Sequence, residues 1–271
     1  MNNIVFRNCP NCSHNNAIKA PTRFGNDIWD IKACASCNFV YIETVPVYES
    51  LSEDLAWEKT SFAEKARKAS RDPIRYFISE QLKFFRRSII KRNKLPQLIQ
   101  KYFTKGNVLD IGCAGGGLLA NLDEIYTPHG IEISKNLAQK ANKQVKLRGG
   151  YVVHNDALSG LKELPSDYFS GVILSAFLEH EINPKEVLRE IYRTLSLSGS
   201  CIIKVPNFAS INRLVRGKKW CGFRLPDHVN YFTPANLVGM CLGAGFHIRQ
   251  FKFFDRLPIS DNMWIIIQKL K

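Results

Sequence analysis

Long apolar runs are missing from this chain of 271 residues, and their absence excludes one class of protein. No stretch approaches the roughly 18 uninterrupted apolar residues that a membrane-spanning helix needs. The N-terminus also lacks the apolar core of a signal peptide. We therefore expect no membrane span and a cytoplasmic protein. In that compartment its eight cysteines are more often thiols or metal ligands than disulfides.

Acidic residues are scarce relative to basic ones, because 24 Asp and Glu stand against 38 Lys and Arg and leave a net charge of +14. The excess is uneven: residues 61–105 carry +10 and residues 211–271 carry +7, whereas 1–60 and 106–210 carry −2 and −1. A basic surface attracts polyanions such as RNA, an acidic membrane face or nucleotide-linked substrates. It also serves solubility alone, and both interpretations stay open here.

A glycine-rich turn follows a short apolar run at residues 107–117, Asn-Val-Leu-Asp-Ile-Gly-Cys-Ala-Gly-Gly-Gly. Gly112 and the three glycines at 115–117 can take positive φ and let the backbone approach a ligand closely. No Lys-Ser/Thr pair follows the glycines, which disfavours a P-loop. The pattern predicts a nucleotide cradle at the end of a strand.

A second acid follows at a distance typical of a βαβ unit. Glu132 lies 22 residues after Asp110, in the apolar run 130–134, and an acid near this spacing suits hydrogen bonding to ribose hydroxyls. A third predicted strand runs into Asn155-Asp156-Ala157. The later strands are predicted at residues 150–154, 171–175, 200–205, 246–254 and 263–269, the last two as an antiparallel hairpin.

Four cysteines near the N-terminus form two CxxC pairs, Cys9 with Cys12 and Cys34 with Cys37. Each CxxC turns the chain so that two thiolates face one ion, and the spacing between the pairs suits a tetrahedral four-cysteine zinc site. Four thiolates leave no open coordination position, so such a zinc would be structural. The segments 28–33 and 39–42 are predicted to be the paired strands of a zinc ribbon.

Taken in order, these segments resemble those of the class I S-adenosylmethionine (SAM) dependent methyltransferases. The resemblance covers about residues 95–250 and rests on Asp-Ile-Gly-Cys-Ala-Gly-Gly, Gly-Ile-Glu-Ile-Ser, Asn-Asp-Ala, Leu-Glu-His-x-x-x-Pro, Leu-Ser-x-Ser-Gly-Ser and Val-Pro-Asn. Three departures stand out. Ala114 replaces a usual glycine, Ser170-Gly171 replaces a usual acid, and Ser196 to Ser198 replace a usual Lys-Pro. None of them removes a side chain that touches the cofactor in this family.

The resemblance implies an α/β fold, a doubly wound Rossmann-like seven-stranded sheet with a small N-terminal zinc ribbon. We expect the ribbon over residues 1–45 and a helical basic connector over 46–94. The SAM-dependent methyltransferase domain would cover residues 95–271. The implied cofactors are SAM and Zn.

The resemblance also implies which residues bind SAM. The glycine turn would approach the methionine part, Glu132 would take the ribose hydroxyls, and Asp156 with Ala157 would meet the adenine. Ser175 would line the pocket between donor and acceptor. The full predicted cofactor set is Asp110, Gly112, Ala114, Gly116, Glu132, Asp156, Ala157 and Ser175.

Two histidines are candidates for the general base that removes the proton of a hydroxyl acceptor. His180 follows the fourth predicted strand, and His228 lies in an Asp-His-x-x-x-Phe-Thr segment. That segment resembles the loop that often caps the acceptor site in small-molecule methyltransferases. Each histidine could instead make a structural hydrogen bond. Four aromatic residues near His228 could wall an acceptor pocket or belong to the core: Trp220, Phe223, Tyr231 and Phe232.

The combination of ribbon and methyltransferase segments resembles enzymes that methylate sugars or other small metabolites. It predicts methylation, most simply O-methylation, of a small-molecule or glycan-linked acceptor. A zinc knuckle before a SAM domain also resembles the large-subunit rRNA guanine methyltransferases, in which the ribbon would recognise RNA. RNA therefore stays as the alternative acceptor. A third, non-enzymatic alternative would use the ribbon as a protein adaptor, but the intact glycine turn argues against it.

Overall fold

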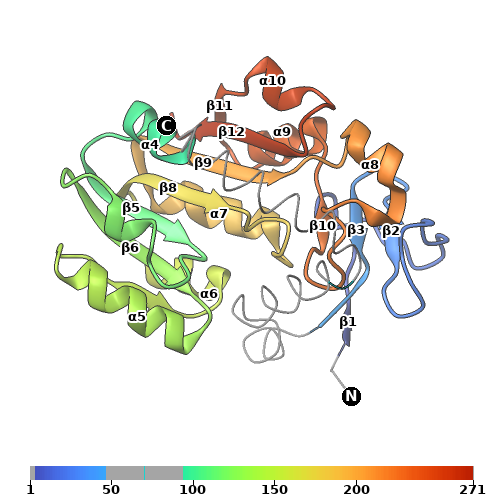
Figure 1. Ribbon diagram of the computed structural model, residues 1–271, viewed down its shortest axis with the longest axis horizontal. Coiled ribbons are helices and arrows are strands. Elements are labelled where there is room, and N and C mark those ends of the chain that lie inside the picture. The colour runs from blue at the N-terminus through green and yellow to red at the C-terminus, as the bar shows by residue number, and fades with distance from the viewer. Residues whose placement is uncertain (1–3, 47–69, 71–93, 271) are drawn as a thin grey trace.

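The computed structural model of the protein describes residues 4–46, 70 and 94–270. A seven-stranded sheet forms its centre, in the order β11-β12-β9-β8-β5-β6-β7 (Figure 1). Its strands are β5 (Gly106–Ile111), β6 (Tyr126–Glu132), β7 (Val152–His154), β8 (Phe169–Ser175), β9 (Leu195–Pro206), β11 (His247–Gln250) and β12 (Asn262–Gln268). β12 runs antiparallel to both neighbours, and the remaining neighbours pair in parallel. The predicted α/β fold with a seven-stranded Rossmann-like sheet is confirmed.

Several strand boundaries differ from those predicted. β9 begins at Leu195, five residues before the predicted run 200–205. β6 begins at Tyr126, four residues before the predicted run, because residues 126–129 continue the parallel pairing with β5. β11 ends at Gln250, and the short helix α10 (Phe253–Arg256) takes the place of the predicted end of that strand. The antiparallel pairing of β11 with β12 agrees with the expected hairpin.

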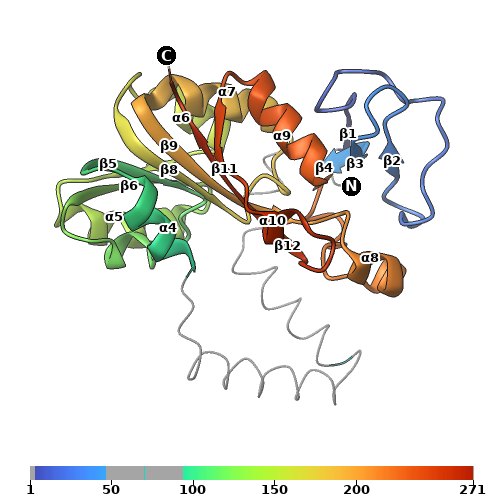
Figure 2. The same ribbon diagram turned by 90° about the horizontal axis from the view of Figure 1, so that it is seen from above.

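Helices cover both faces of the sheet (Figure 2). α6 (Ala157–Glu163), α7 (Pro184–Thr194) and α9 (Pro234–Gly243) lie on one face, and α4 (Lys94–Tyr102) and α5 (Lys135–Lys146) lie on the other. Successive strand residues alternate between these layers: Leu109 and Ile111 pack with the first group of helices and Val108 with the second. Because both faces are covered, the central strands are continuous apolar runs, and this made them visible in the sequence.

The N-terminal segment forms a small sheet beside the large one (Figure 1). β2 (Ile31–Ala33) and β3 (Val40–Ile42) pair antiparallel within the segments predicted for the ribbon. β10 (Asn230–Tyr231) adds a third strand from the far end of the chain. β1 (Ile4–Phe6) pairs separately with β4 (Thr44–Pro46). The ribbon segment therefore completes its sheet with residues of the C-terminal half.

A hydrophobic cluster separate from the core of the large sheet joins the small sheet to residues 208–231. Ile31 and Ile42 of the ribbon pack there with Trp220, Phe223 and Tyr231. Phe232 is also buried, in the core of the large sheet. All four aromatic residues near His228 thus belong to the core, which favours the second of the two interpretations left open by the sequence.

The predicted connector, residues 46–94, lies almost wholly outside the described residues, and so does most of the basic stretch 61–105. Within the described ranges, no helix combines the length and apolarity that a bilayer crossing requires.

Candidate active site

The glycine-rich turn leaves β5 at the carboxyl edge of the sheet. Gly112 and Gly116 have φ angles of +74° and +78°, and Ala114 adopts +47°. A Cβ on Gly112 would lie 2.9 Å from Cδ2 of Phe177, and one on Gly116 would lie 3.0 Å from Cα of Ala141. Conformation and space therefore both require glycine at these two positions. Ala114 takes a left-handed conformation at the position where the resembled family usually has glycine.

Glu132, the last residue of β6, ties this turn to the next loop. One carboxylate oxygen accepts a hydrogen bond from the N–H of Ala114 at 2.8 Å, and the other accepts one from the N–H of Ser134 at 2.9 Å. The residue is buried. The acid expected to bind ribose thus also shapes the glycine turn.

Asp110 lies two residues before Gly112 and is buried. Burial, together with the negative charge of Glu132, raises the pKa of its carboxyl to about 7. Strongly shifted carboxyls are concentrated at functional sites, because such sites keep charged groups in desolvated surroundings.

The remaining predicted cofactor residues lie at the carboxyl ends of the adjacent strands. Asp156 follows β7 and caps α6, accepting a hydrogen bond from a backbone N–H of the first helical turn at 2.9 Å. Ala157 is the buried first residue of α6, and Ser175 ends β8. Since β8, β5, β6 and β7 are consecutive in the sheet, the structure brings the predicted cofactor residues to one edge. In open α/β sheets this edge is where ligands bind.

Glu179, His180 and His228 form a second group of polar side chains, from the loop after β8 and the segment before β10. The two imidazole rings lie edge to face, with their centroids 4.6 Å apart. One carboxylate oxygen of Glu179 and one nitrogen of each ring lie within 4.8 Å of one another. The structure therefore brings the two candidate bases together, beside a buried carboxylate that was not among the predicted site residues.

Both rings are oriented through Nδ1. The Nδ1 atom of His180 lies 2.9 Å from the carbonyl oxygen of Asp227 and 3.3 Å from its carboxylate. The Nδ1 atom of His228 lies 2.9 Å from the carbonyl oxygen of Gly222. A ring nitrogen that faces a carbonyl oxygen carries the hydrogen, so the lone pair of each neutral ring is on Nε2. Each histidine thus makes a structural hydrogen bond and keeps its second nitrogen for chemistry.

The two rings titrate in opposite directions. Burial lowers the pKa of His180, but the hydrogen bond and charge of Asp227 and the charge of Glu179 outweigh it, and the pKa is raised. Burial and the positive charges of His180 and Arg224 lower the pKa of His228 well below its usual value. Burial also raises the pKa of Glu179. His228 is therefore neutral near pH 7.

Asn230 fixes the loop that carries Glu179. Its Nδ2 atom donates to the carbonyl oxygens of Leu178 at 2.8 Å and Glu181 at 2.6 Å, and its N–H donates to the carbonyl oxygen of Glu179 at 3.0 Å. Arg7 in turn donates to Oδ1 of Asn230. The sequence carries no signal for either residue, because no local pattern links positions so far apart.

The four N-terminal cysteines form a third group. The sulfur atoms of Cys9 and Cys37 are 3.6 Å apart, those of Cys12 and Cys34 are 3.5 Å apart, and all four lie within 4.8 Å of one another. Sulfurs held about 2.3 Å from a tetrahedral zinc ion would be separated by about 3.8 Å. The arrangement therefore fits an ion of this size.

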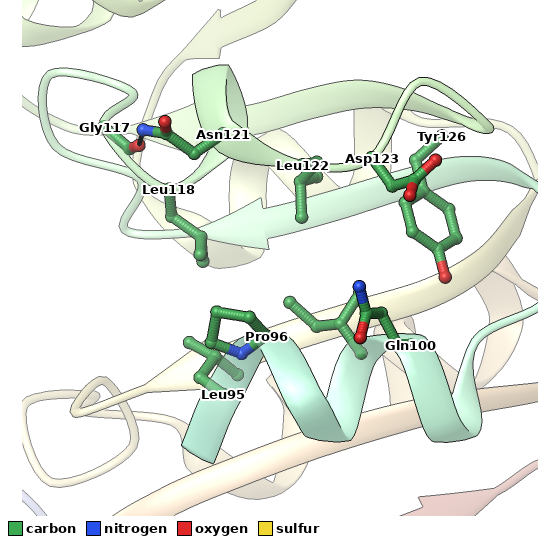
Figure 3. Close-up of a pocket in the computed structure, with 10 residues that line it drawn as sticks. Leu95, Pro96, Gln100, Gly117, Leu118, Asn121, Leu122, Asp123 and Tyr126 are labelled. Carbon is green, nitrogen blue, oxygen red and sulfur yellow. Dashed lines mark hydrogen bonds between the residues drawn. The ribbon is translucent and has the colours of Figure 1, made fainter. Parts of the chain in front are cut away.

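A hollow of about 510 Å³ lies between α4 and the region of the 3-10 helix η1 (Leu119–Asn121), as Figure 3 shows. It borders the glycine turn through Gly117. Its lining residues are Leu95, Pro96, Ile99, Gln100, Gly117, Leu118, Asn121, Leu122, Asp123 and Tyr126. No predicted cofactor residue or histidine is among them. We therefore place the active site at the carboxyl edge of the sheet and not in this hollow.

The sheet order, the glycine turn and the row of acids define a class I methyltransferase fold. A family model described as a methyltransferase domain matches residues 82–250 of the chain. Because this match covers more than half of the sequence, the chain belongs to that methyltransferase family. The expected SAM-dependent methyltransferase domain is thereby confirmed at the level of family and fold.

Individual relatives are more distant. The chain is 33% identical over 109 residues to the bifunctional methionine biosynthesis protein MetXA/MetW of Rhodopirellula baltica, which covers 38% of this chain and 17% of that protein. It is 25% identical over 183 residues to the ubiquinone biosynthesis O-methyltransferase of Psychrobacter arcticus, and this match covers 58% of this chain and 65% of that protein. The chain thus spans less than two thirds of both relatives. A SAM-dependent methyltransferase from Archaeoglobus fulgidus shares the fold, with a TM-score of 0.50 and 21% identity over 65% of this chain and 91% of that one.

Proposed function

We propose that this chain is an enzyme that transfers a methyl group from SAM to a small-molecule or glycan-linked acceptor, in particular to a hydroxyl oxygen. One observation carries the proposal: the glycine turn after β5 and a pair of histidines, one of them in the loop after β8, occur in the same structure. Similarity to a protein named as an O-methyltransferase supports oxygen as the methylated atom.

The proposed binding of SAM follows the row of strand ends. Asp110, Gly112, Ala114 and Gly116 would hold its methionine part, where a Cβ on either glycine would collide with a neighbour. Glu132, the last residue of β6, would take the ribose hydroxyls, as an acid at the end of the second strand of a βαβ unit does. The adenine would lie against Asp156 and Ala157, with Ser175 between donor and acceptor. When bound, SAM supplies a methyl group on a positively charged sulfur that a nucleophile can displace.

The histidine pair would act on the acceptor. Methyl transfer is an in-line displacement, so the protein mainly has to align the acceptor oxygen with the methyl carbon. As the O–C bond forms and the C–S bond breaks, the hydroxyl proton would pass to Nε2 of His228 or His180 and then to water. The buried ring of His228 is neutral near pH 7, so its Nε2 can accept that proton, and its lowered pKa favours rapid release of the proton to water.

The four cysteines would hold a structural zinc ion, as their sulfur separations allow. The proposed organisation keeps a ribbon over residues 1–45, a connector over 46–94 and a methyltransferase domain over 95–271. RNA is the second candidate acceptor, because Arg216 ends α8 (Ile211–Arg216) and Lys218 and Lys219 lie in the 3-10 helix that follows it. Such a cluster is able to contact a phosphate backbone.

Calorimetric titration with SAM tests the cofactor site. The unaltered protein should bind, and the double variant Glu132→Ala, Asp156→Ala should lose binding while still unfolding cooperatively. Glu124→Ala, which removes an exposed acid elsewhere, is the matched control and should bind normally. Unchanged SAM affinity in the double variant would refute the assigned pocket.

Labelled SAM and a fractionated cell extract then identify the acceptor class. The proposal expects label in small molecules or glycans that resist nuclease treatment. If the label enters RNA and the affinity for RNA falls steeply with salt, RNA and not a small molecule or glycan would be the acceptor.

A further inference from the structure

We propose that Glu179, His180 and His228 form a binding site for a divalent transition-metal ion, separate from the four-cysteine group. Two imidazoles and one carboxylate are a donor set that zinc and related ions favour in proteins. Their candidate ligand atoms lie within 4.8 Å of one another. Ligands at about 2.1 Å from an ion stand about 3.0 to 3.4 Å apart. The ligand atoms would therefore have to move together by less than about 2 Å to surround an ion.

Glu179 provides the first independent observation. The residue is 1% exposed, and its Oε2 atom has no hydrogen-bond partner within the part of the chain that the structure describes. A buried carboxylate oxygen without a partner is strongly unfavourable, and a bound cation is the partner that best compensates it. The backbone at this point is fixed, because the N–H groups of Val229 and Asn230 donate to the carbonyl oxygen of Glu179 at 2.7 and 3.0 Å.

The orientation of the two rings provides the second observation. Metal-binding histidines almost always donate their other ring N–H to a carbonyl or carboxylate, which fixes the ring and the tautomer. His180 does so toward Asp227, through both the carbonyl and the carboxylate, and His228 does so toward Gly222. In its neutral form each ring therefore has its lone pair on Nε2, the nitrogen that a metal ion would bind. The guanidinium group of Arg224 is paired with the carboxylate of Asp227 at 2.8 Å.

The role of this ion rests on the proposed function. Three protein ligands leave coordination positions open, and a hydroxyl oxygen bound to a divalent ion has a lowered pKa. The acceptor hydroxyl then loses its proton to water, and its oxygen bonds to the methyl carbon as the C–S bond breaks. In this form of the mechanism His180 and His228 act on the acceptor proton through the ion. The site thus selects acceptors whose methylated atom is a hydroxyl oxygen.

Metal content of the full chain tests the proposal. After equilibration with excess zinc and gel filtration, the unaltered protein should hold about two zinc ions per chain and Glu179→Gln should hold about one. Glutamine keeps the size of the side chain, so this variant should fold, which a melting curve checks. Cys12→Ser should also reduce the count by about one, since it damages the other group. His154→Ala, which replaces an exposed histidine outside both groups, should keep both ions.

Cobalt(II) distinguishes the two sites by their ligands. With the cysteine group filled by zinc, added cobalt should give a visible spectrum without thiolate charge transfer, and Glu179→Gln should abolish it. Asp227→Asn removes the carboxylate charge 3.3 Å from Nδ1 of His180 but keeps the backbone hydrogen bond, so it should lower cobalt affinity about tenfold.

One zinc per chain in the unaltered protein, with no cobalt spectrum that depends on Glu179, would overturn the metal site. Methyl transfer by such a protein would leave the proposed function standing, with the histidines acting directly. Two ions per chain without SAM binding would instead retain the metal site and refute the proposed function. The two ideas therefore fail separately.

Discussion

The guanidinium group of Arg7 donates a hydrogen bond to the side-chain oxygen of Asn230 at 3.1 Å, across 223 positions of sequence. The same group donates to the carbonyl oxygens of Ile42, Ile182 and Val229 at 2.8, 2.9 and 2.6 Å. One side chain therefore joins the ribbon, the loop that precedes α7 and the segment that carries His228. Since Asn230 also holds the loop of Glu179, the ribbon is coupled to the histidine cluster.

Replacing Arg7 by alanine should destabilise the protein by about 2 to 4 kcal/mol, because four hydrogen-bond acceptors lose their donor. Urea unfolding measures this change. Arg189→Ala is the control, because that arginine is exposed and, among the described residues, its one ion pair is a 3.9 Å contact within its own helix. It should change stability by less than about 0.5 kcal/mol. Equal effects of the two substitutions would contradict the joining role of Arg7.

Gly112→Ala should weaken SAM binding at least about tenfold and destabilise the fold by about 1 to 3 kcal/mol. The new Cβ would lie 2.9 Å from the Phe177 ring, on a backbone with φ of +74°. Gly117→Ala offers a matched comparison, since a Cβ there meets no atom of the described residues within 4 Å. Calorimetry with SAM and thermal melting report the two effects. A tolerated alanine at 112 would show that the turn is not the cradle.

Asp110 should make stability fall as pH rises. Its pKa is about 7 in the folded protein and 3.8 in an unstructured chain, so between these values the folded state keeps a proton that the unfolded state has lost. The free energy of unfolding therefore decreases through this range and stays low above pH 7. Asp110→Asn removes the dependence, and its advantage over the unaltered protein should grow by about 2 to 3 kcal/mol between pH 5 and pH 8. If urea unfolding of the unaltered protein and of Asp110→Asn gave parallel pH profiles of stability, the raised pKa of Asp110 would be excluded.

Cys34→Ser should release the metal of the cysteine group and loosen the histidine cluster at the same time. The physical reason is that β10 is the third strand of the ribbon sheet and that Trp220 and Tyr231 share a core with Ile31. We expect a loss of about one zinc per chain and a lower melting temperature. Hydrogen exchange should show faster exchange at Val229 and Asn230. Cys221→Ser, at an exposed cysteine, should leave both properties unchanged.

The sheet and the cofactor edge could be predicted because their signals are local. The runs at 107–111 and 171–175 lie between two helical layers, so they are mostly apolar and stand out in the sequence. Asp110 and Glu132 lie near the carboxyl ends of β5 and β6, and Asp156 follows β7. The CxxC pairs are equally local. Roles for these residues in binding SAM and zinc remain predictions that the experiments above test.

Other features could not be predicted from the sequence, because they depend on contacts between distant segments or on the exposure of individual side chains. Phe253 and Phe254 lengthen an apolar run in the sequence, and for this reason the strand predicted at 246–254 is too long. In the structure both side chains lie on α10 and are 69% and 73% exposed. The two-residue strand β10 is too short to carry a periodic pattern. The partners of Arg7 lie on three separate segments, and the burial of Glu179 follows from the placement of two loops.

Pairing between β3 and β10 also sets an order of events during synthesis. β3 is synthesised almost 190 residues before Asn230 and Tyr231. During that time the edge of β3 that pairs with β10 has no partner strand. Sheet contacts of such long sequence separation form late in folding. The three-stranded ribbon sheet is therefore completed only after residue 230 has been synthesised. A fragment that ends before residue 230 lacks β10 and so lacks the third strand of this sheet.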